Sequence, residues 1–382
     1  MKTIAVIFGS RSTEHDVSIV TAVSAIIKPL KLTGKYNVVP VYISKDGSWY
    51  SDEKLGDISF YSSGDVEDKL SRLKKINLKF DDGLWLIKPG LGGEKIRIDV
   101  VFPATHGTYG EDGSLMGLLE MAGVAYVGCD VASSAIAMDK VLSKQVASSA
   151  GVATNKWLQL GRAEFEEDRE NSLKKLNNLK MPLFVKPAHL GSSIAVSRVK
   201  DAKELTNALE VVFHYDDKAI VEEEVSNLVE VTVPIMGNEN LRVAMVEETL
   251  NKKSEFFDFN TKYMQGGKKG KGGTKASGNY SRIPAKISKD LYVKSEQTAK
   301  DVYQAIGCSG TARIDLLIDT KANEVYFNEI NPMPGGLYQH NWNKAGVSNV
   351  ELVERLIELA SERYDNRKKR STVFKTNFLE QF

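Results

Sequence analysis

Alternating apolar and polar residues mark two neighbouring strands in the last third of the chain. Thr311–Ile318 and Val325–Asn331 both follow the two-residue period of a half-buried strand, and Thr320–Asn323 forms the turn between them. Side chains two positions apart lie on the same face of a strand. We therefore expect the hairpin to collect one arginine, two acids and one amide on a single surface: Arg313, Asp315, Glu329 and Asn331.

The oxygen atoms of these side chains suit Mg²⁺, which binds a few carboxylates and completes its octahedron with water and phosphate oxygens. Arg313 beside them could hold a phosphate or a developing negative charge. The alternative is a solvated hairpin face that binds nothing, which a lone charged strand does not exclude.

The apolar run Thr3–Phe8 predicts a buried strand, and the turn Gly9–Ser12 leads it into a helix that begins near Asp16. A strand, a glycine turn and a helix N-terminus form the usual anion-binding geometry of open α/β sheets. Glu14 and His15 lie on this turn, where capping of the helix is the simpler interpretation of both.

A second glycine-rich loop, residues 103–113, follows the predicted strand Ile98–Phe102. Open sheets bind ligands at the carboxyl ends of parallel strands, so this loop is a candidate binding loop. We expect His106 to be exposed there, because a buried loop leaves backbone polar groups without partners. An ordinary turn residue is the alternative for His106.

Apolar residues at helical spacing predict one helix over Asp130–Ala150. Lys140 lies inside it, on what is usually a solvated face. A surface helix is expected over Glu164–Leu179.

The strand Leu183–Pro187 carries Lys186, and the turn Gly191–Ser193 separates it from a second strand at Ile194–Val196. Backbone N–H groups and hydroxyls at such a turn can cover a triphosphate. The chain has no GxxxxGK[ST] motif, so this is not a P-loop.

The middle of the chain predicts further elements of a mixed fold: a helix over Asp201–Phe213, a strand Ile220–Val225 ending in three acids, and antiparallel strands at Glu230–Ile235 and Arg242–Glu248. Residues 265–279 are mainly Gly, Lys, Ser and Thr, a composition that predicts a mobile loop because it cannot bury a core.

Two helices are expected near the end, Leu291–Ile306 and Val350–Ala360. Beyond them, three phenylalanines four residues apart form one apolar helical stripe: Phe374, Phe378 and Phe382. We expect this stripe to pack on the body of the protein or across a dimer interface.

Length and composition limit the number of domains, the kinds of partner and the kinds of metal site that can be expected. A length of 382 residues predicts two or three domains, and a net charge of +1 gives no reason to expect nucleic acid or an anionic membrane as a partner. Two cysteines without zinc-binding spacing predict neither a disulfide framework nor a zinc site. The chain begins directly with a strand and has no apolar run of about 18 residues, so a cytoplasmic protein is expected.

Taken together, several segments resemble the ATP-grasp ligases and, within them, the D-alanine–D-alanine ligase family. In chain order these are STEHDVS (12–18), THGTYGEDGSLMGLLEMAGVAYVG (105–128), SSAIAMDK (133–140), FVKPAHLGSS (184–193), FFDFNTKY (256–263), ARID (312–315) and FNEINPMPG (327–335). The resemblance extends from Ile4 to about Ala360. Its order and spacing are specific, although each segment alone is short.

The resemblance implies an α/β and α+β protein with an ATP-grasp fold of three domains. Residues 1–127 would form a parallel α/β domain that binds substrate. Residues 128–226 and 227–364 would form two α+β subdomains that enclose ATP, and residues 365–382 a basic and aromatic tail.

The resemblance also implies nucleotide-binding residues. The phosphates would be held by lysines and a closing loop: Lys140, Lys186, Ser193 and Lys262. Adenine and ribose would be bordered by residues at the acidic strand: Glu222, Glu223, Val225 and Glu230. Two Mg²⁺ ions, or Mn²⁺ in their place, would be held by the hairpin: Asp315, Glu329 and Asn331.

For the substrates, the resemblance implies that Glu14 binds the ammonium group of the first amino acid and forms a triad with Ser192 and Tyr263. His106 would lie near the first carboxylate. Arg313 and the Gly335 N–H would stabilise the tetrahedral intermediate. His340 and Asn341 fall where the family binds the second amino acid's carboxylate.

The implied reaction joins two D-alanines for peptidoglycan precursor synthesis, catalysed by a homodimer. ATP would convert the first carboxylate into an acyl phosphate, which the second amine attacks. Such chemistry needs positioning and charge neutralisation, which lysines, metal ions and an arginine provide. The loop 265–279 would be a natural lid against water.

The segment Gly336–Trp342 departs from the family pattern, since it is shorter by about one helical turn and carries His340 in place of a small residue. We therefore expect a second-site preference shifted towards a larger or more polar amino acid than D-alanine. A related ligase with a different second substrate is one alternative. A nucleotide-binding protein without ligase activity is another, but it would need no metal pair.

Overall fold

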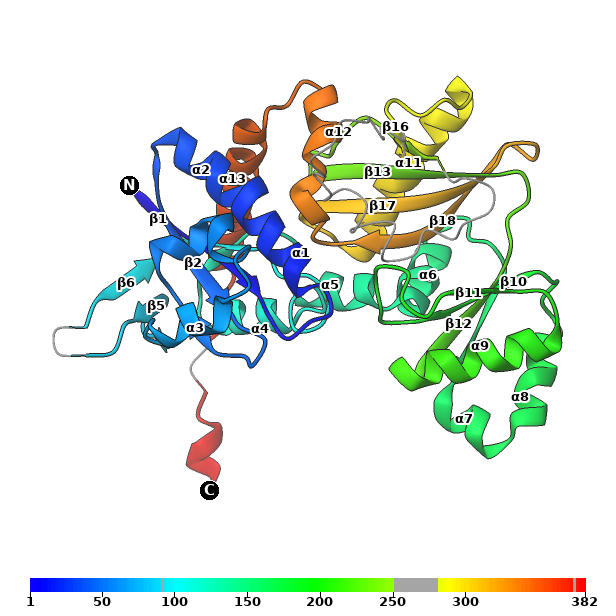
Figure 1. Ribbon diagram of the computed structural model, residues 1–382, viewed down its shortest axis with the longest axis horizontal. Coiled ribbons are helices and arrows are strands. Elements are labelled where there is room, and N and C mark those ends of the chain that lie inside the picture. The colour runs from blue at the N-terminus through cyan, green and yellow to red at the C-terminus, as the bar shows by residue number, and fades with distance from the viewer. Residues whose placement is uncertain (91–92, 251–280, 374–375) are drawn as a thin grey trace.

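The computed structural model describes residues 1–90, 93–250, 281–373 and 376–382. Three main sheets organise these residues, and helices cover them (Figure 1). The segments Phe256–Tyr263 and 265–279, together with Lys262, Tyr263 and Phe374, lie outside the described residues.

The first sheet has the strand order β3-β2-β1-β7-β8. Parallel pairing joins four of its strands, and β3 is an antiparallel edge. The strands are β1 (Lys2–Gly9), β2 (Tyr36–Ile43), β3 (Trp49–Tyr50), β7 (Val100–Pro103) and β8 (Ala125–Tyr126). This confirms the predicted parallel N-terminal sheet.

Both faces of the first sheet are buried, so β1 is apolar and buried from Ile4 to Phe8. Alternate residues of β1 face two different cores: Ile4, Val6 and Phe8 face one, and Ala5 and Ile7 face the other. The first core includes α1 (His15–Val20), the π-helix η1 (Thr21–Ile27), α2 (Lys28–Thr33) and α13 (Asn349–Lys368). The second includes α4 (Ser114–Met121) and a small sheet of β4 (Asn77–Phe80), β5 (Leu84–Ile87) and β6 (Lys95–Ile98). Short elements between β3 and β4 are η2 (Glu53–Gly56), η3 (Ile58–Phe60) and α3 (Val66–Ser71).

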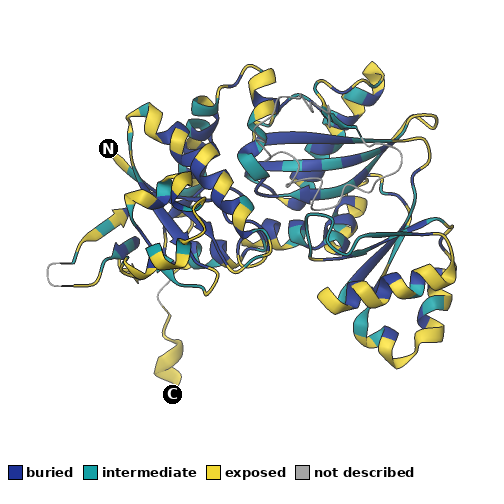
Figure 2. Cartoon of the chain, viewed as in Figure 1, coloured by how far each residue is buried: buried dark blue, intermediate teal, exposed yellow. Residues whose placement is uncertain are grey.

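The second sheet is antiparallel, with the order β11-β10-β12-β9. Its strands are β9 (Trp157–Gly161), β10 (Leu183–Pro187), β11 (Ser197–Val199) and β12 (Lys218–Glu223). One face packs against α7 (Arg162–Glu167), α8 (Arg169–Leu176) and α9 (Ala202–Tyr215), whose outer surfaces are exposed (Figure 2). Leu183 and Val185 point into this core, which directs Phe184 and Lys186 to the opposite face.

The third sheet has the order β16-β15-β13-β17-β18, and β14 also pairs with β13. Its strands are β13 (Leu228–Gly237), β14 (Arg242–Val243), β15 (Glu247–Thr249), β16 (Ser281–Arg282), β17 (Gly310–Asp319) and β18 (Glu324–Asn331). Its apolar face packs against α5 (Val131–Met138), α6 (Lys140–Ser149) and α11 (Lys289–Ile306). After β18 the chain forms η4 (Gly335–Tyr338) and α12 (Gln339–Lys344).

Figure 1 shows the first sheet on one side of the molecule and the other two sheets on the opposite side, with α5 between them and α6 beside the second and third sheets. The C-terminal tail extends away from the body and ends in η5 (Phe378–Gln381). None of the helices in the described ranges is both long and apolar enough to cross a membrane.

Several predicted elements need correction. The helix predicted over Asp130–Ala150 is two helices, because Asp139 is extended and its carboxylate caps α6 through the N–H groups of Val141 and Leu142. The helix predicted over Glu164–Leu179 is likewise divided into α7 and α8 at the cap Asp168.

The strand predicted at Ile194–Val196 is wrong. Ala195 has a positive φ of 56°, which an extended strand does not allow, and β11 begins only at Ser197. The tail is also not packed on the body at the two described phenylalanines, since Phe378 and Phe382 are 57% and 95% exposed. Packing across a dimer interface stays a prediction.

Candidate active site

The predicted hairpin of β17 and β18 is confirmed, and its register places the polar residues opposite one another. Asp315 pairs with Glu329, and Arg313 with Asn331. Thr232 on β13 pairs with Asp315 and donates a 2.8 Å hydrogen bond to its Oδ1. These side chains therefore lie on the face of the third sheet that is turned away from the apolar core.

Two carboxylates directly opposite each other repel unless cations neutralise them. Arg313 donates bonds of 3.0 and 2.6 Å to Asp315, and its Nη2 lies 3.9 Å from Glu329. The Lys140 ammonium lies 3.4 Å from the other oxygen of Glu329. The face is thus a cluster of acids with cations around it. The carboxylates are oxygen ligands of the kind that Mg²⁺ binds, and the cations suit phosphate groups.

The oxygen donors of this face fit Mg²⁺ in kind. Throughout the described ranges, no group of three or more His, Cys, Asp or Glu side chains is arranged to hold a metal ion. A divalent ion here would therefore use the two carboxylates, the amide oxygen of Asn331 and oxygens from nucleotide or water. Asn331 Oδ1 accepts a 3.0 Å bond from the Met333 N–H, which fixes its orientation and leaves a second lone pair.

Lys186 extends from the second sheet towards the third. It forms an ion pair with Glu222 and donates a 3.1 Å hydrogen bond to Asn328 Oδ1 on β18. Phe184, Lys186 and Glu222 share one sheet face, because Phe184 and Glu222 are paired across β10 and β12. Lys186 is therefore at the junction of the two sheets, where the resemblance expects the phosphates.

Lys144 is a site residue that the sequence analysis missed. Its ammonium is buried, 2.7 Å from Glu222 Oε1, and donates to Asn155 Oδ1 at 2.8 Å and to the Phe327 carbonyl at 3.0 Å. Burial alone would raise the pKa of Glu222, but the Lys144 and Lys186 ammonium groups lower it to about 2. The four-residue spacing from Lys140 to Lys144 was the available signal, but it could not show which lysine is buried.

The loop 188–196 carries Ser192 and Ser193, both with positive φ near 57°. Ser192 donates a hydrogen bond to Glu14 Oε1, so the loop of the second sheet contacts the turn after β1. Gly191 lies against the same carboxylate: a Cβ there would be 3.2 Å from Glu14 Oε2. The predicted pairing of Glu14 with Ser192 is present in the structure.

Glu14 is a partly buried acid that contacts the loop of the second sheet and lies near Arg313 of the third. Burial and the neighbouring Glu111 carboxylate raise its pKa, whereas Ser192, His106 and Arg313 lower it. A raised pKa means that the ionised carboxylate is unfavourable in its surroundings, and an added cation nearby would stabilise it. An ammonium group of a ligand would supply that cation.

The prediction that His106 is exposed is wrong, since only 2% of this residue is accessible. Its Nε2 lies 3.0 Å from Thr21 Oγ1, and its Nδ1 lies 3.5 Å from Glu111 Oε1. Glu111 Oε2 also accepts a 2.7 Å bond from the Gly107 N–H. The loop can be buried here because the Glu111 side chain, from the same loop, accepts the hydrogen bond of a backbone N–H group. The prediction of exposure assumed that such groups would have no partner.

Thr21 links this loop to the turn after β18, because its hydroxyl accepts a 3.0 Å bond from the Gly336 N–H. Gly336, Leu337 and Tyr338 all have positive φ, so the three residues after Gly335 form a left-handed turn. Gly335 packs on α1, where a Cβ would lie 3.7 Å from Val17 Cγ1.

His340 and Asn341 lie at the start of α12, directly after this turn. His340 Nε2 is 2.9 Å from Glu247 Oε2 on β15, and its ring is 5.1 Å from that of Tyr338, which in turn lies 5.2 Å from the Arg313 guanidinium. Asn341 is buried and donates to the Met245 carbonyl at 2.9 Å. The Asn341 amide nitrogen therefore serves the packing of α12, and Glu247 is a neighbour that the sequence analysis did not include.

The residues expected near adenine and ribose lie where β12 leaves the second sheet and β13 enters the third. Glu223 lies 3.6 Å from Lys156 and accepts from the Lys180 N–H at 3.0 Å. Val225 is buried, and Glu230 is near enough to Lys186 to act on its charge. This junction adjoins the phosphate-binding candidates.

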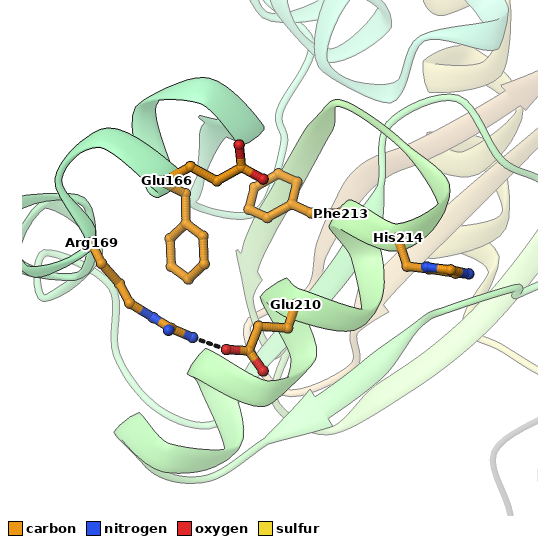
Figure 3. Close-up of a pocket in the computed structure, with 6 residues that line it drawn as sticks. Glu166, Arg169, Glu210, Phe213 and His214 are labelled. Atoms are coloured by element: carbon orange, nitrogen blue, oxygen red, sulfur yellow. Dashed lines mark hydrogen bonds and ion pairs between the residues drawn. The ribbon is translucent and has the colours of Figure 1, made fainter.

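A separate surface pocket lies among α7, α8 and α9, away from these residues (Figure 3). Arg169 forms an ion pair with Glu210 across it and stacks on Phe165. None of the predicted site residues lines this pocket, so it is not the candidate active site.

Family models support the same interpretation. Residues 3–129 match the model described as the D-ala D-ala ligase N-terminus, and residues 146–358 match the D-ala D-ala ligase C-terminus. The chain belongs to the D-alanine–D-alanine ligase family. The division between the two matches falls near α5, where the chain passes from the first sheet towards the other two.

Relatives of the D-alanine–D-alanine ligase family match over nearly the whole chain. The D-alanine–D-alanine ligase of Chloroherpeton thalassium is 37% identical, covering 97% of this chain and 99% of that protein. The corresponding protein of Thermosipho melanesiensis is also 37% identical, covering 96% of each.

Solved structures of the family are also similar. The D-alanine-D-alanine ligase from Coxiella burnetii has a TM-score of 0.79 at 30% identity and covers 97% of this chain and 98% of that one. The VanG D-Ala:D-Ser ligase from Enterococcus faecalis has a TM-score of 0.78 at 33% identity and covers 94% of this chain and 99% of that one. The ATP-grasp fold expected from the sequence is thereby confirmed.

Proposed function

We propose that this protein is an ATP-dependent ligase that joins two D-alanines through an acyl phosphate, for peptidoglycan precursor synthesis. Its membership of the family supports this reaction. The observation that carries the proposal is the meeting at Glu14 of three parts of the chain: the turn after β1, the loop at Ser192 and the hairpin at Arg313.

The first amino acid binds at Glu14, in the proposed arrangement. Its ammonium group supplies a positive charge beside a partly buried carboxylate, whose pKa is raised first of all by desolvation. His106 lies beside this position and is held by Thr21 and Glu111. The carboxylate of the amino acid then points towards the cationic hairpin.

ATP binds between the second and third sheets. Lys140 and Lys186 neutralise its phosphates, and Ser192 and Ser193 cover them from the loop 188–196. The nucleoside lies towards the junction of β12 and β13, bordered by Glu222, Glu223, Val225 and Glu230. Lys262 and Tyr263, the other residues expected to act here, lie outside the described residues.

We propose that Asp315, Glu329 and Asn331 hold Mg²⁺, with Mn²⁺ as a substitute. When bound, such an ion neutralises phosphate charge during phosphoryl transfer. The protein's own contribution is to hold the two carboxylates opposite each other, with Arg313 and Lys140 balancing their charge.

In the first step, a carboxylate oxygen of the first amino acid attacks the γ-phosphorus of ATP, and ADP leaves. In the second, the amine of the second amino acid attacks the carbonyl carbon of the acyl phosphate. The tetrahedral intermediate carries an oxyanion, which the Arg313 guanidinium and the Gly335 N–H stabilise. Collapse expels phosphate and forms the peptide bond as the amine loses a proton.

A second candidate is a related ligase that adds a different amino acid in the second step. The observation that favours it is His340, whose Nε2 lies 2.9 Å from Glu247 Oε2 and whose ring lies against that of Tyr338 at the expected second site. An imidazole and a carboxylate make this site bulkier and more polar than a hydroxyl would. A larger or more polar second amino acid than D-alanine fits such a site.

The two candidates are separated by measuring phosphate release from ATP across pairs of D- and L-amino acids, with products identified by mass. D-alanyl-D-alanine as the main product supports the first candidate, and a mixed dipeptide supports the second. His340→Ser should shift a mixed preference back towards D-alanine. If the wild type and the variant both give mainly D-alanyl-D-alanine, the second candidate fails.

We further propose that the protein acts as a homodimer in the cytoplasm. Sedimentation equilibrium measures the mass in solution directly, and a monomer at micromolar concentration would contradict the dimer.

A further inference from the structure

A cluster of charged residues lies beneath the loop 188–196 and has no role in the function proposed above. His189 is the second residue after β10 and lies two residues before the Gly191–Ser193 turn. Its neighbours come from three other elements: Asp139 at the start of α6, Asp216 at the end of α9, and Lys218 at the start of β12.

Asp216 holds His189 through both backbone and ring. Its Oδ2 accepts a 2.8 Å bond from the His189 N–H, and its Oδ1 lies 2.9 Å from His189 Nδ1. The same Oδ1 accepts a 3.1 Å bond from the Lys218 N–H. One buried carboxylate therefore ties the base of the loop to the end of α9 and the start of β12.

Asp139 holds the opposite edge of the ring. Its Oδ2 lies 3.2 Å from His189 Nε2 and 2.6 Å from the Lys218 ammonium. Its Oδ1 caps α6, whose first residue is Lys140. The ring of His189 thus connects the helix that begins with a phosphate-binding lysine to the loop proposed to cover the phosphates.

Both ring nitrogens face carboxylates, and only the imidazolium has two N–H donors. Hydrogen bonds to Asp139 and Asp216 raise the pKa of His189 to about 9, against the effect of burial. The ring is therefore charged at neutral pH. The carboxylates of Asp139 and Asp216 then balance the charges of His189 and Lys218. The cluster therefore has no net charge, beside the position proposed for the ATP phosphates.

The loop above this cluster needs support from its base. Ser192, Ser193 and Ala195 all have positive φ, a conformation that L-residues adopt only when the surrounding structure holds them there. Lys140 contacts the residues on either side of His189: its N–H donates to the Ala188 carbonyl at 3.0 Å, and its ammonium to the Leu190 carbonyl at 2.7 Å. The ring of His189 adds a further link between the loop and α6, through Asp139.

We propose that His189 is a positioning residue of the nucleotide site: its ring, held between Asp139 and Asp216, fixes the base of the loop 188–196 beside Lys140. This inference rests on the proposed function, because it assumes that the loop and Lys140 bind ATP phosphates. His189 itself does not contact the nucleotide.

The test is direct binding of a non-hydrolysable ATP analogue with Mg²⁺, measured by titration calorimetry on the full chain. His189→Asn should bind the analogue about ten-fold more weakly, the size expected for a lost hydrogen bond to a charged group. The affinity for D-alanine, measured separately, should change little. His214→Asn is the matched control, because His214 is an exposed histidine at the end of the neighbouring α9, on the surface shown in Figure 3.

A pH series distinguishes positioning from general damage to the fold. His189→Arg keeps a permanent cation with several donors, and the 46% exposure of the His189 side chain leaves room for it. The wild type should lose affinity as the pH rises through about 9, whereas His189→Arg should retain affinity without that loss. The charged groups that face the ring in this titration are Asp139, Lys140, Asp216 and Lys218, while Asp217 is directed outwards to Arg162.

Unchanged affinity of His189→Asn, or the same loss above pH 9 in His189→Arg as in the wild type, would overturn the inference. If His189→Asn does not fold, the comparison of His189→Arg with the wild type still decides. A wild-type protein that binds no ATP analogue at any pH would instead refute the proposed function, and this inference with it.

Discussion

Glu14 shows how one partly buried charge can be arranged for a ligand. Its pKa is raised by burial above the value of 4.5 that applies to the unfolded chain. The folded state therefore binds this proton more tightly, and the resulting stability is present below pH 4.5 and lost as the pH rises through the folded pKa. At neutral pH the ionised carboxylate opposes folding.

Glu14→Gln should consequently raise the melting temperature at neutral pH by about 1–3 °C, and the difference should vanish below the unfolded pKa. The same variant should lose D-alanine binding, because an amide cannot neutralise an ammonium group. Melting curves at two pH values and calorimetry with D-alanine measure both effects. A variant that is less stable than the wild type at neutral pH would refute the argument.

Glu329 carries a second residue-scale prediction. Glu329→Gln removes one charge from the face of β18 but keeps the size of the side chain, so turnover should fall by about 10²-fold or more. The melting temperature should stay nearly constant, because the change releases repulsion with Asp315.

The control for Glu329→Gln is Glu324→Gln, at the exposed far end of the same strand, which should keep full activity. Initial rates of phosphate release compare the two variants. Near-normal turnover in Glu329→Gln would contradict the proposed metal ligand.

At the scale of elements, Lys144 connects three of them. It lies on α6 and bonds to Glu222 on β12 and to the Phe327 carbonyl on β18. Removing one partner of a buried ion pair typically costs about 3–5 kcal/mol. Lys144→Met should therefore lower the melting temperature by several degrees, even without nucleotide.

Calorimetric melting of Lys144→Met measures this effect. Lys174→Met on the exposed part of α8 is the control, since its pairing with Glu170 lies at the surface and contributes little. Equal melting temperatures for Lys144→Met and the wild type would show that the buried pair does not hold α6 to the two sheets.

The whole molecule is held together by contacts between segments that are far apart in the sequence. Gly336 donates to Thr21, and Gln339 donates to the Ala25 carbonyl at 2.8 Å, which joins the end of the third sheet to the first. Arg363 on α13 donates to the Tyr126 carbonyl at 3.0 Å. These contacts join the part of the chain around the first sheet to the end of the third sheet, next to α13.

The C-terminal tail is outside this body. Phe378, Leu379 and Phe382 are 57%, 81% and 95% exposed, so they bury little apolar surface within one chain. Truncation after Arg370 should leave the melting temperature unchanged within about 1 °C. A drop of several degrees would mean that the tail is covered in solution, and a lower mass in sedimentation would identify a second chain as what covers it.

Local patterns determined the elements that carry the site. The strands of the hairpin, their turn and the common face of Arg313 and Asp315 all follow from a two-residue period, which depends only on backbone geometry. The order of the motifs was also sufficient to identify the family, since motif order is a property of the chain alone.

Tertiary structure decided which polar groups are buried and with which partners. His106 is buried because Glu111 and Thr21 satisfy the loop around it, and Lys144 is buried because Glu222 on another sheet neutralises it. The break at Asp139 depends on a cap that also holds His189 from a distant loop. Sequence patterns report the periodicity of a segment, whereas the burial of a charge depends on partners supplied by segments far away in the chain, so only the folded structure could decide it.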